Sequence, residues 1–184
     1  MVSRTEAKLR KVEEEIQRYG VQTKVLVKDF YQNANSAFYE QIKTDCQHLD
    51  IALVVANAGV MLIEPFESQA PSDIQKMLDV DLYHVLHMSK TFLPQLQRRG
   101  KSALINVSST IGNVPGPNAL VYAACKGFVH QLTRGVQREA PGVDVQLLEP
   151  GVTRTNLVRG LSANPCCDTA QACAEGSLRD LGAE

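Results

Sequence analysis

Hydrophobic positions recur along the chain at two periods, one typical of helices and one typical of strands. Apolar side chains spaced by three and four residues predict helices at residues 5–19, 33–49, 72–99 and 119–139. Shorter apolar stretches predict strands at residues 21–27, 51–55, 103–107 and 143–148. Strands that alternate with helices of this length indicate an α/β fold built on a parallel sheet.

The ends of the predicted helices carry residues that cap or terminate helices. Thr5 is placed to cap the first helix and Gly20 to end it. Ser72 and Asp73 are placed to open the longest helix, which Gly100 stops. The face of that helix predicted to point inward carries Ile74, Met77, Leu82, Val85, Ser89, Phe92 and Leu96.

Composition narrows the class of protein. The chain has 184 residues, 44% of them hydrophobic, and a net charge of -1, which predicts one globular domain over residues 1–184. Basic residues (19) balance acidic ones (20) and are spread along the chain, so neither a nucleic-acid footprint nor a basic membrane-binding patch is predicted. The five cysteines lack metal-ligand spacing, and no metal site is expected.

The amino terminus is too charged for a signal peptide, and no apolar stretch reaches the ~20 residues that cross a bilayer. As the sequence stands we expect a cytoplasmic location, or the endoplasmic reticulum if an N-terminal anchor belongs to the protein.

In an open parallel sheet, ligands bind where the strands end at their carboxyl side. The residues that follow the predicted strands are therefore the candidates for a site. They are Ser3 and Arg4, Asp29, Asn57 to Gly59, Ser108 and Ser109, and Pro150 to Thr155.

Tyr122 and Lys126 lie four residues apart on a predicted helix, so both side chains share one face. An ammonium near a phenol lowers the pKa of the phenol from about 10, which predicts a general acid/base. The same spacing also arises by chance on solvated helices. Ser109 ends a strand thirteen residues earlier, where its hydroxyl either polarises a substrate carbonyl or makes a local turn bond.

Four motifs in order, "NAG", "INVSS", "YAACK" and "PGVTRT", resemble the short-chain dehydrogenase/reductase family. The flanks are similar to the microsomal 3-oxoacyl-CoA reductase and 17β-hydroxysteroid dehydrogenase branch. The resemblance implies a doubly wound, Rossmann-like parallel sheet. It also implies that Tyr122 donates the proton in ketone reduction, that Lys126 tunes Tyr122 and holds the nicotinamide ribose, and that Ser109 orients the carbonyl.

The resemblance implies NADP as the cofactor. Arg4 resembles the partner of its 2′-phosphate, because a guanidinium there favours NADP over NAD, and Asp29 resembles the residue beside the adenine. The turn of Asn57, Ala58 and Gly59 would close against the cofactor. A second segment would hold the nicotinamide carboxamide, and it consists of Pro150, Gly151, Val152 and Thr155.

The sequence departs from the family pattern at several points. Asp81 stands where the family places a catalytic asparagine, and an ionised carboxylate there would raise the pKa of Tyr122 and oppose Lys126; otherwise it is a tolerated polar substitution. Cys125 replaces a common serine. No "GxxxGxG" run, which would hold the pyrophosphate, occurs anywhere in the chain.

Met1 falls within the second strand of the family pattern, and the final strand is also missing, so we expect a sheet incomplete at both ends. Residues 21–28 would be able to slide in beside residues 51–55 and fill the place of the first strand.

These features favour an NADP(H)-dependent oxidoreductase that interconverts a ketone and a secondary alcohol, with a 3-oxoacyl thioester or a steroid-like molecule as the small-molecule substrate. The alternative is a truncated, non-catalytic family member or an interaction module without nucleotide binding. A phosphate-binding regulator of another α/β family has little support because no phosphate loop is present. The resemblance also allows a homo-oligomer.

Overall fold

The computed structural model describes residues 1–114, 116–155, 157 and 168–182. Its helices are α1 (Glu6–Gln17), α2 (Ser36–Asp45), α3 (Pro71–Met77), α4 (His84–Arg99), α5 (Leu120–Glu139) and α6 (Ala170–Asp180). Tighter or wider turns of helix are η1 (Phe66–Ser68), η2 (Leu78–Tyr83) and η3 (Thr110–Asn113). The strands are β1 (Val2–Ser3), β2 (Leu26–Val27), β3 (Leu53–Ala56), β4 (Ser102–Val107), β5 (Val143–Leu148), β6 (Thr153–Arg154) and β7 (Asp168–Thr169).

All strand pairs in the described part of the chain are parallel, and the α/β fold class is confirmed. β4 lies between β3 and β5, with Leu53 opposite Ala103 and Ser102 opposite Val143. β1 pairs with β2 in a separate two-stranded sheet, and β6 with β7 in another. Such parallel strands need crossover connections, which α1 provides between β1 and β2, α4 between β3 and β4, and α5 between β4 and β5.

The idea that residues 21–28 pair beside residues 51–55 is wrong. β2 forms from Leu26 and Val27 alone and pairs with β1, because Leu26 N–H donates to Met1 O (2.9 Å) and Lys28 N–H to Ser3 O (3.0 Å). With its backbone groups satisfied there, β2 leaves the edge of β3 unpaired.

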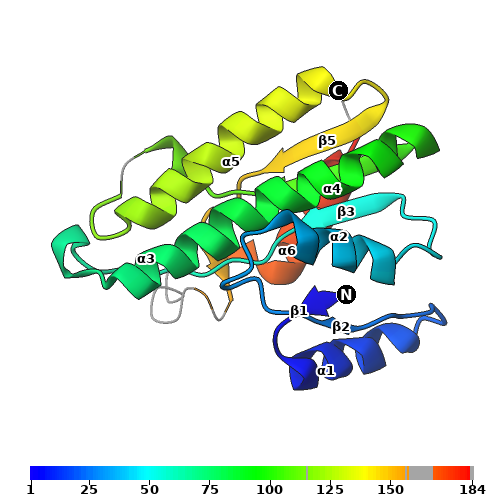
Figure 1. Ribbon diagram of the computed structural model, residues 1–184, viewed down its shortest axis with the longest axis horizontal. Coiled ribbons are helices and arrows are strands. Elements are labelled where there is room, and N and C mark those ends of the chain that lie inside the picture. Colours follow the sequence, from blue (N-terminus) through cyan, green and yellow to red (C-terminus); the bar gives the residue numbers. More distant parts are fainter. Residues whose placement is uncertain (115, 156, 158–167, 183–184) are drawn as a thin grey trace.

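Helices cover the β3–β4–β5 sheet on two faces. α2, α4 and α5 lie on one face, with α4 and α5 side by side, while α6 lies on the other (Figure 1). We call β3, β4, β5, α2, η2, α4 and α5 the sheet body. The N-terminal unit, residues 1–27, lies beside the sheet body at the β3 side (Figure 1).

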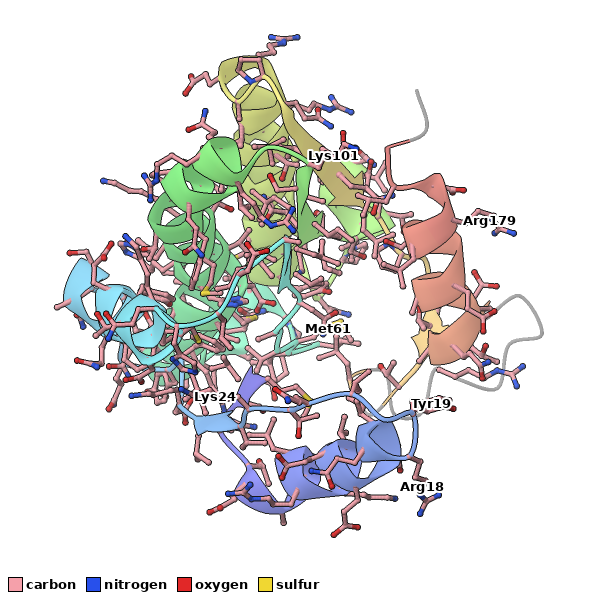
Figure 2. All side chains as sticks on the ribbon, turned by 90° about the vertical axis from the view of Figure 1, so that its right-hand side faces the viewer. Arg18, Tyr19, Lys24, Met61, Lys101 and Arg179 are labelled. Atoms are coloured by element: carbon pink, nitrogen blue, oxygen red, sulfur yellow. The ribbon has the colours of Figure 1, made fainter. Side chains whose placement is uncertain are left out.

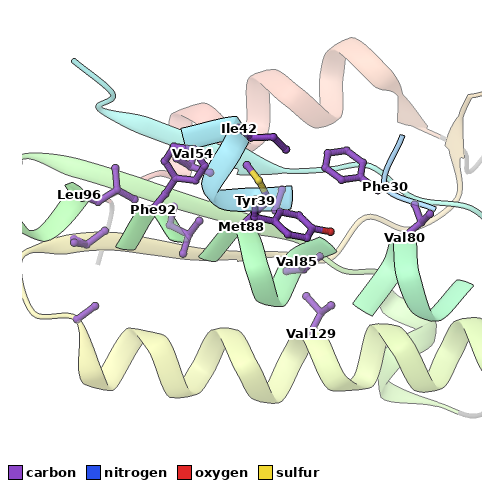
Figure 3. Packing of buried hydrophobic residues seen from close by; sticks show 14 residues of the cluster. Phe30, Tyr39, Ile42, Val54, Val80, Val85, Met88, Phe92, Leu96 and Val129 are labelled. Atoms are coloured by element: carbon purple, nitrogen blue, oxygen red, sulfur yellow. The ribbon is translucent and has the colours of Figure 1, made fainter. Parts of the chain in front are cut away.

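The core lies between the sheet and its first helical layer. Tyr39 of α2, Phe92 and Leu96 of α4, Leu104 of β4 and Val129 of α5 meet there (Figure 3). Their apolar area is the main favourable contribution to folding, about 25 cal/mol per Å² buried. This packing holds β4 and the start of α5 at fixed positions.

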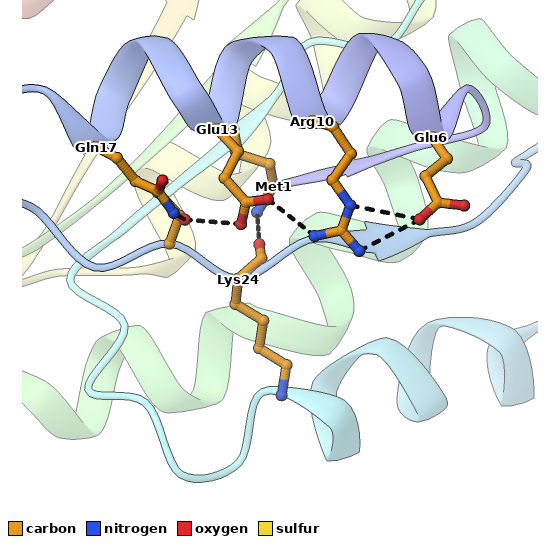
Figure 4. Close-up of polar contacts among 7 residues, drawn as sticks. Met1, Glu6, Arg10, Glu13, Gln17 and Lys24 are labelled. Atoms are coloured by element: carbon orange, nitrogen blue, oxygen red, sulfur yellow. Dashed lines mark hydrogen bonds and ion pairs between the residues drawn. The ribbon is translucent and has the colours of Figure 1, made fainter.

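The surface of the N-terminal unit carries a series of hydrogen bonds and ion pairs (Figure 4). Arg10 pairs with Glu6 (3.2 Å) and Glu13 (2.8 Å), and Thr23 Oγ1 donates to Glu13 Oε1 (2.8 Å). The Met1 ammonium donates to Lys24 O (2.6 Å). These bonds tie α1 to the segment before β2.

The longest predicted helix is interrupted. Residues 72–99 form α3, the π-helical turn η2 and α4, and the helix begins one residue earlier than expected, at Pro71. Neither Thr5 nor the residue before Pro71 makes a side-chain cap bond, whereas Asn35 accepts from Phe38 N–H at 3.0 Å and caps α2. α1 ends at Gln17, and Gly20 forms the left-handed turn that follows (φ 72°).

Candidate active site

A cavity of about 1080 Å³ lies where the strands end at their carboxyl side. It is bounded by the N-terminal unit, the sheet body and α6. Figure 2 views the molecule from the opposite side, where the strands begin, and shows Met61 between the unit and α6. Predicted site residues in its lining are Arg4, Asp29, Asn57, Ala58, Gly59, Ser109, Tyr122, Lys126, Pro150, Gly151, Val152 and Thr155. Asp81 does not line the cavity and lies behind Lys126.

Ser109 follows β4 and caps η3. Its hydroxyl accepts from Ile111 N–H and donates to Pro150 O, both at 3.4 Å. Thr110 N–H also donates to Pro150 O (3.2 Å), which joins the turns after β4 and β5. Both hydrogen bonds of Ser109 are long and therefore weak, so its hydroxyl can still form a hydrogen bond with a ligand.

η3 packs directly on α5 because Gly112 has no side chain. A Cβ at Gly112 would lie 2.8 Å from the carbonyl carbon of Lys126 and 2.9 Å from Gly127 N. Ser108 adds a bond from its buried hydroxyl to Lys126 O (2.8 Å). The loop that carries Ser109 is therefore held against the helix that carries Tyr122 and Lys126.

Tyr122 and Lys126 lie one turn apart on α5, as their spacing predicts. The Lys126 ammonium lies 5.5 Å from the centre of the Tyr122 ring and donates to Val107 O at 3.0 Å. Both side chains are buried. A strand-end carbonyl thus fixes where the ammonium stands.

Asp81 lies in η2 and is fully buried. Its Oδ1 is 3.6 Å from Lys126 Nζ and accepts from Val60 N–H at 3.2 Å. Gly59 packs against this pair, because a Cβ there would lie 3.0 Å from Asp81 Oδ1. The turn after β3, the π-helical turn and α5 meet at this ion pair.

Burial dominates the proton affinities of these groups. Burial first and the charge of Asp81 second raise the pKa of Tyr122 to about 12, while a hydrogen bond with Ser109 acts in the opposite direction. The lowered pKa of Tyr122 expected from Lys126 alone is wrong, because burial of the phenol, and then the charge of Asp81, raise it. Burial also raises the pKa of Asp81 to about 7, against the effects of Lys126 and of the Val60 N–H.

The family model for short chain dehydrogenases matches residues 1–165. The chain belongs to the short-chain dehydrogenase family. The branch expected from the flanks is also confirmed by similarity to two curated proteins. A very-long-chain 3-oxoacyl-CoA reductase of Anas platyrhynchos is 32% identical over 85% of this chain and 52% of its own length. The 17-beta-hydroxysteroid dehydrogenase type 3 of Homo sapiens is 31% identical over 97% of this chain and 58% of its own.

A solved structure agrees with the fold. The gluconate 5-dehydrogenase of Burkholderia cenocepacia J2315, in complex with NADP and tartrate, superposes with a TM-score of 0.78 at 25% identity. The match covers 90% of this chain and 65% of that one. The chain spans about half the length of the curated short-chain dehydrogenases that it matches.

Sequence reasoning missed His84, which begins α4. Its ring is 4.2 Å from that of Phe30, and its Nδ1 has no hydrogen-bond partner. Burial, and then the charge of Lys126, lowers the pKa of His84 to about 4, so it is neutral at pH 7. Sequence reasoning also missed that Gly112 lets η3 pack against α5. Its position three residues after Ser109 was the signal that could have found it.

Cys125 is buried, and burial raises the pKa of its thiol to about 12, so it is an unreactive thiol rather than a nucleophile. Among the residues that the structure describes, no group of His, Cys, Asp or Glu side chains is arranged to hold a metal ion. Within the same residues, no helix has the length and apolar character needed to cross a membrane.

Proposed function

We propose that this short-chain dehydrogenase chain forms the catalytic part of an NADP(H)-dependent oxidoreductase that interconverts a ketone and a secondary alcohol. One observation carries the proposal: Ser109, Tyr122 and Lys126, which are far from Arg4 in sequence, line the same cavity as Arg4. Ser109, Tyr122 and Lys126 are the chemistry-bearing residues of the family resemblance, and Arg4 offers an exposed guanidinium for a phosphate.

Each side chain takes one part of the reaction. Tyr122 donates a proton to the carbonyl oxygen, and its phenol form at neutral pH suits that role. The Ser109 hydroxyl orients the carbonyl, and Lys126 places positive charge beside the phenol. A bound nicotinamide cofactor would supply the hydride to the carbonyl carbon.

The donor set of the cavity fits such a cofactor. The cavity volume of about 1080 Å³ is close to the upper limit for small-molecule sites, whose volumes are ~300–1,000 Å³. Gly151 leaves open space at the rim, since a Cβ there would meet nothing within 4 Å. Arg4 is exposed at the edge and would pair with the 2′-phosphate of NADP, with Asp29 beside the adenine.

The other predicted contacts follow from the two turns. Asn57, Ala58 and Gly59 would close against the cofactor, and the segment Pro150–Thr155 would hold its carboxamide. The NADP held by the Burkholderia dehydrogenase supports this choice of cofactor.

For the substrate we propose a 3-oxoacyl thioester or a steroid-like ketone. Support comes from the names of the two curated relatives and from apolar side chains in the lining, among them Met61, Ile63 and Leu157. An extended acyl chain or a sterol ring system would bury against such side chains.

A non-catalytic chain is the second candidate function. The observation that favours it is the separation of β1 from β3, which leaves one edge of the apolar strand β3 without a partner strand among the described residues. An exposed apolar edge is a template for another strand. In this case the chain would act as an interaction module without nucleotide.

The test uses two proteins: the 184-residue chain, and the same chain extended at its amino terminus by a strand, a glycine-rich turn and a helix of the kind that the family resemblance implies. We expect the extended chain to oxidise NADPH when a ketone is added, and Tyr122→Phe to abolish turnover while NADPH still binds. Retained turnover in Tyr122→Phe would assign the acid to another residue.

The 184 residues contain no glycine-rich turn to hold a pyrophosphate. We therefore expect the unextended chain to show no measurable turnover and only weak NADPH fluorescence enhancement. Micromolar binding with ketone-dependent oxidation would contradict this expectation. In the extended chain Arg4→Ala should weaken NADPH binding by roughly 1.5–3 kcal/mol and barely change NADH binding.

A further inference from the structure

The Asp81–Lys126 pair is the most deeply buried pair of opposite charges among the described residues. Asp81 is 0% and Lys126 3% exposed at the side chain, and their charged atoms are 3.6 Å apart. Each has one further bond to the backbone, from Val60 N–H to Asp81 and from Lys126 to Val107 O. The pair is therefore satisfied on both sides, and above neutral pH, where Asp81 is ionised, it carries no net charge.

This neutrality matters for Tyr122. The Lys126 ammonium is 5.5 Å from the ring centre, near enough to favour a phenolate if it acted alone. Asp81 lies behind the ammonium and opposes it, and its charge acts on Tyr122 as well. An asparagine would keep the shape and could still accept the Val60 N–H bond, but it would carry no charge.

We infer that Asp81 is a positioning residue that holds Lys126 in a buried, neutral ion pair, so that Tyr122 remains a phenol and the site favours proton donation to a carbonyl over proton removal from an alcohol. The inference rests on the proposed function. The reaction balances in the usual way: the cofactor gives a hydride to the carbonyl carbon, the phenol gives a proton to the oxygen, and the cofactor is oxidised. The reverse direction needs the phenolate, which the pair disfavours.

Other titratable groups face the pair from three elements. Tyr122 and Cys125 lie on α5, and His84 begins α4. Asp79 shares η2 with Asp81, but its oxygens accept from Gln32 N–H and Gln75 Nε2, both at 2.8 Å. Asp79 acts on Tyr39 instead. It is therefore a matched control, a buried carboxylate on the same turn with different partners.

The decisive measurement is a pH titration of the 184-residue chain labelled with ¹³Cζ-tyrosine and followed by NMR. Tyr122→Phe identifies the Tyr122 signal. In Asp81→Asn we expect that signal to move toward phenolate at a pH lower by about 1 or more than in the wild type. Asp79→Asn should leave it in place and shift the Tyr39 signal. Asp81→Ser, with a hydroxyl to accept from Val60, replaces Asp81→Asn if the latter does not fold.

An unmoved Tyr122 titration in the folded Asp81 variant overturns the inference, and so would an equal shift in Asp79→Asn. Neither cofactor nor substrate is needed, so a failure of the proposed function leaves this result intact. In the extended chain at pH 8, where Asp81 is mostly ionised, the ratio of the maximal rate of alcohol oxidation to that of ketone reduction should rise about tenfold in Asp81→Asn, since one pH unit changes the phenolate fraction tenfold. An unchanged ratio overturns the directional bias.

Discussion

The N-terminal unit and the sheet body carry their charges in opposite places. In the N-terminal unit the ion pairs of Arg10 are at the surface, and α1 buries one residue, Leu9. In the sheet body the core is apolar, and charged groups such as Asp81 and Lys126 are buried against it. Surface ion pairs contribute little to stability, whereas buried groups are costly to leave unpaired.

The difference teaches where function resides in this chain. The sheet body fixes Tyr122 and Lys126 by packing and by backbone bonds, so the proposed chemistry has rigid supports. The N-terminal unit offers Arg4, with Asp29 just after it, from a two-stranded sheet that packs on the body through Val2 and Leu26. Changes in the sheet body should therefore have larger effects than matched changes in the unit.

The largest expected effect is a change in the pH dependence of stability in Asp81→Asn. The folded chain holds the Asp81 proton up to about pH 7 and the unfolded chain to about 3.8, so the folded state binds more protons in that window. The free energy of unfolding therefore loses on the order of 1.4 kcal/mol per pH unit as pH rises through it. Asp81→Asn removes this slope, so its free energy of unfolding should rise relative to that of the wild type as pH rises over the same range, although Lys126 is left unpaired.

His84 works in the opposite direction. Its pKa falls from 6.5 to about 4 on folding, so the unfolded state binds more protons between these values and stability rises with pH there. In the wild type the effects of Asp81 and His84 on the pH dependence of stability offset each other. In Asp81→Asn the rise of stability with pH caused by His84 should become visible. Urea unfolding at intervals from pH 4 to 8 measures both, and parallel curves for the two proteins would contradict the assignment.

The next effect is a cavity in the core. Leu104 is 0% exposed in β4, and Leu104→Ala should lower the free energy of unfolding by about 2–5 kcal/mol. Leu9→Ala, the matched change in α1, should cost less, because Leu9 lies outside the main cluster. Chemical denaturation of both variants compares the two regions directly. Equal losses in the free energy of unfolding would contradict the expected difference between the sheet body and the N-terminal unit.

A smaller effect is expected from a methyl group at Gly112. Its Cβ would overlap the backbone of α5, so Gly112→Ala should cost about 1–3 kcal/mol and separate Ser109 from Tyr122. Gly151→Ala is the control, since its Cβ meets nothing within 4 Å. The thermal midpoints of the two variants should therefore differ, and a Gly112→Ala variant as stable as Gly151→Ala would refute the close packing.

The smallest effect is expected at the surface of the unit. Arg10→Ala removes two exposed ion pairs and should leave the denaturation midpoint unchanged within error. Added salt should likewise have little effect on the wild type, because these charges are already screened. A clear loss of stability in Arg10→Ala would show that the unit depends on its surface charges.

Much of this arrangement was open to prediction from local patterns. The run at 51–55 and the motif around Tyr122 reflect burial and helical spacing within a few residues, and the structure forms β3 and α5 there. The charge balance at Asp81 was harder, because it depends on Lys126, which is 45 residues away in sequence. Spacing on α5 alone therefore gave the wrong direction for the Tyr122 pKa.

The π-helical turn also escaped prediction, although the sequence contains a sign of it. The predicted inward face steps by five residues from Met77 to Leu82, one more than a regular helix allows. The turn is stabilised from outside by the bonds of Asp79 to Gln32 and of Asp81 to Val60. Those partners lie 47 and 21 residues away, beyond the reach of a periodicity argument.

The close approach of η3 to α5 also limits how this sequence can drift. Any side chain at position 112 would require the backbone of α5 to shift, whereas a side chain at position 151 would enter open space at the cavity rim. Substrate preference can therefore diversify along the Pro150–Thr155 segment while the spacing between Ser109 and Tyr122 stays fixed. A saturation library should recover almost only glycine at position 112 and many residues at position 151.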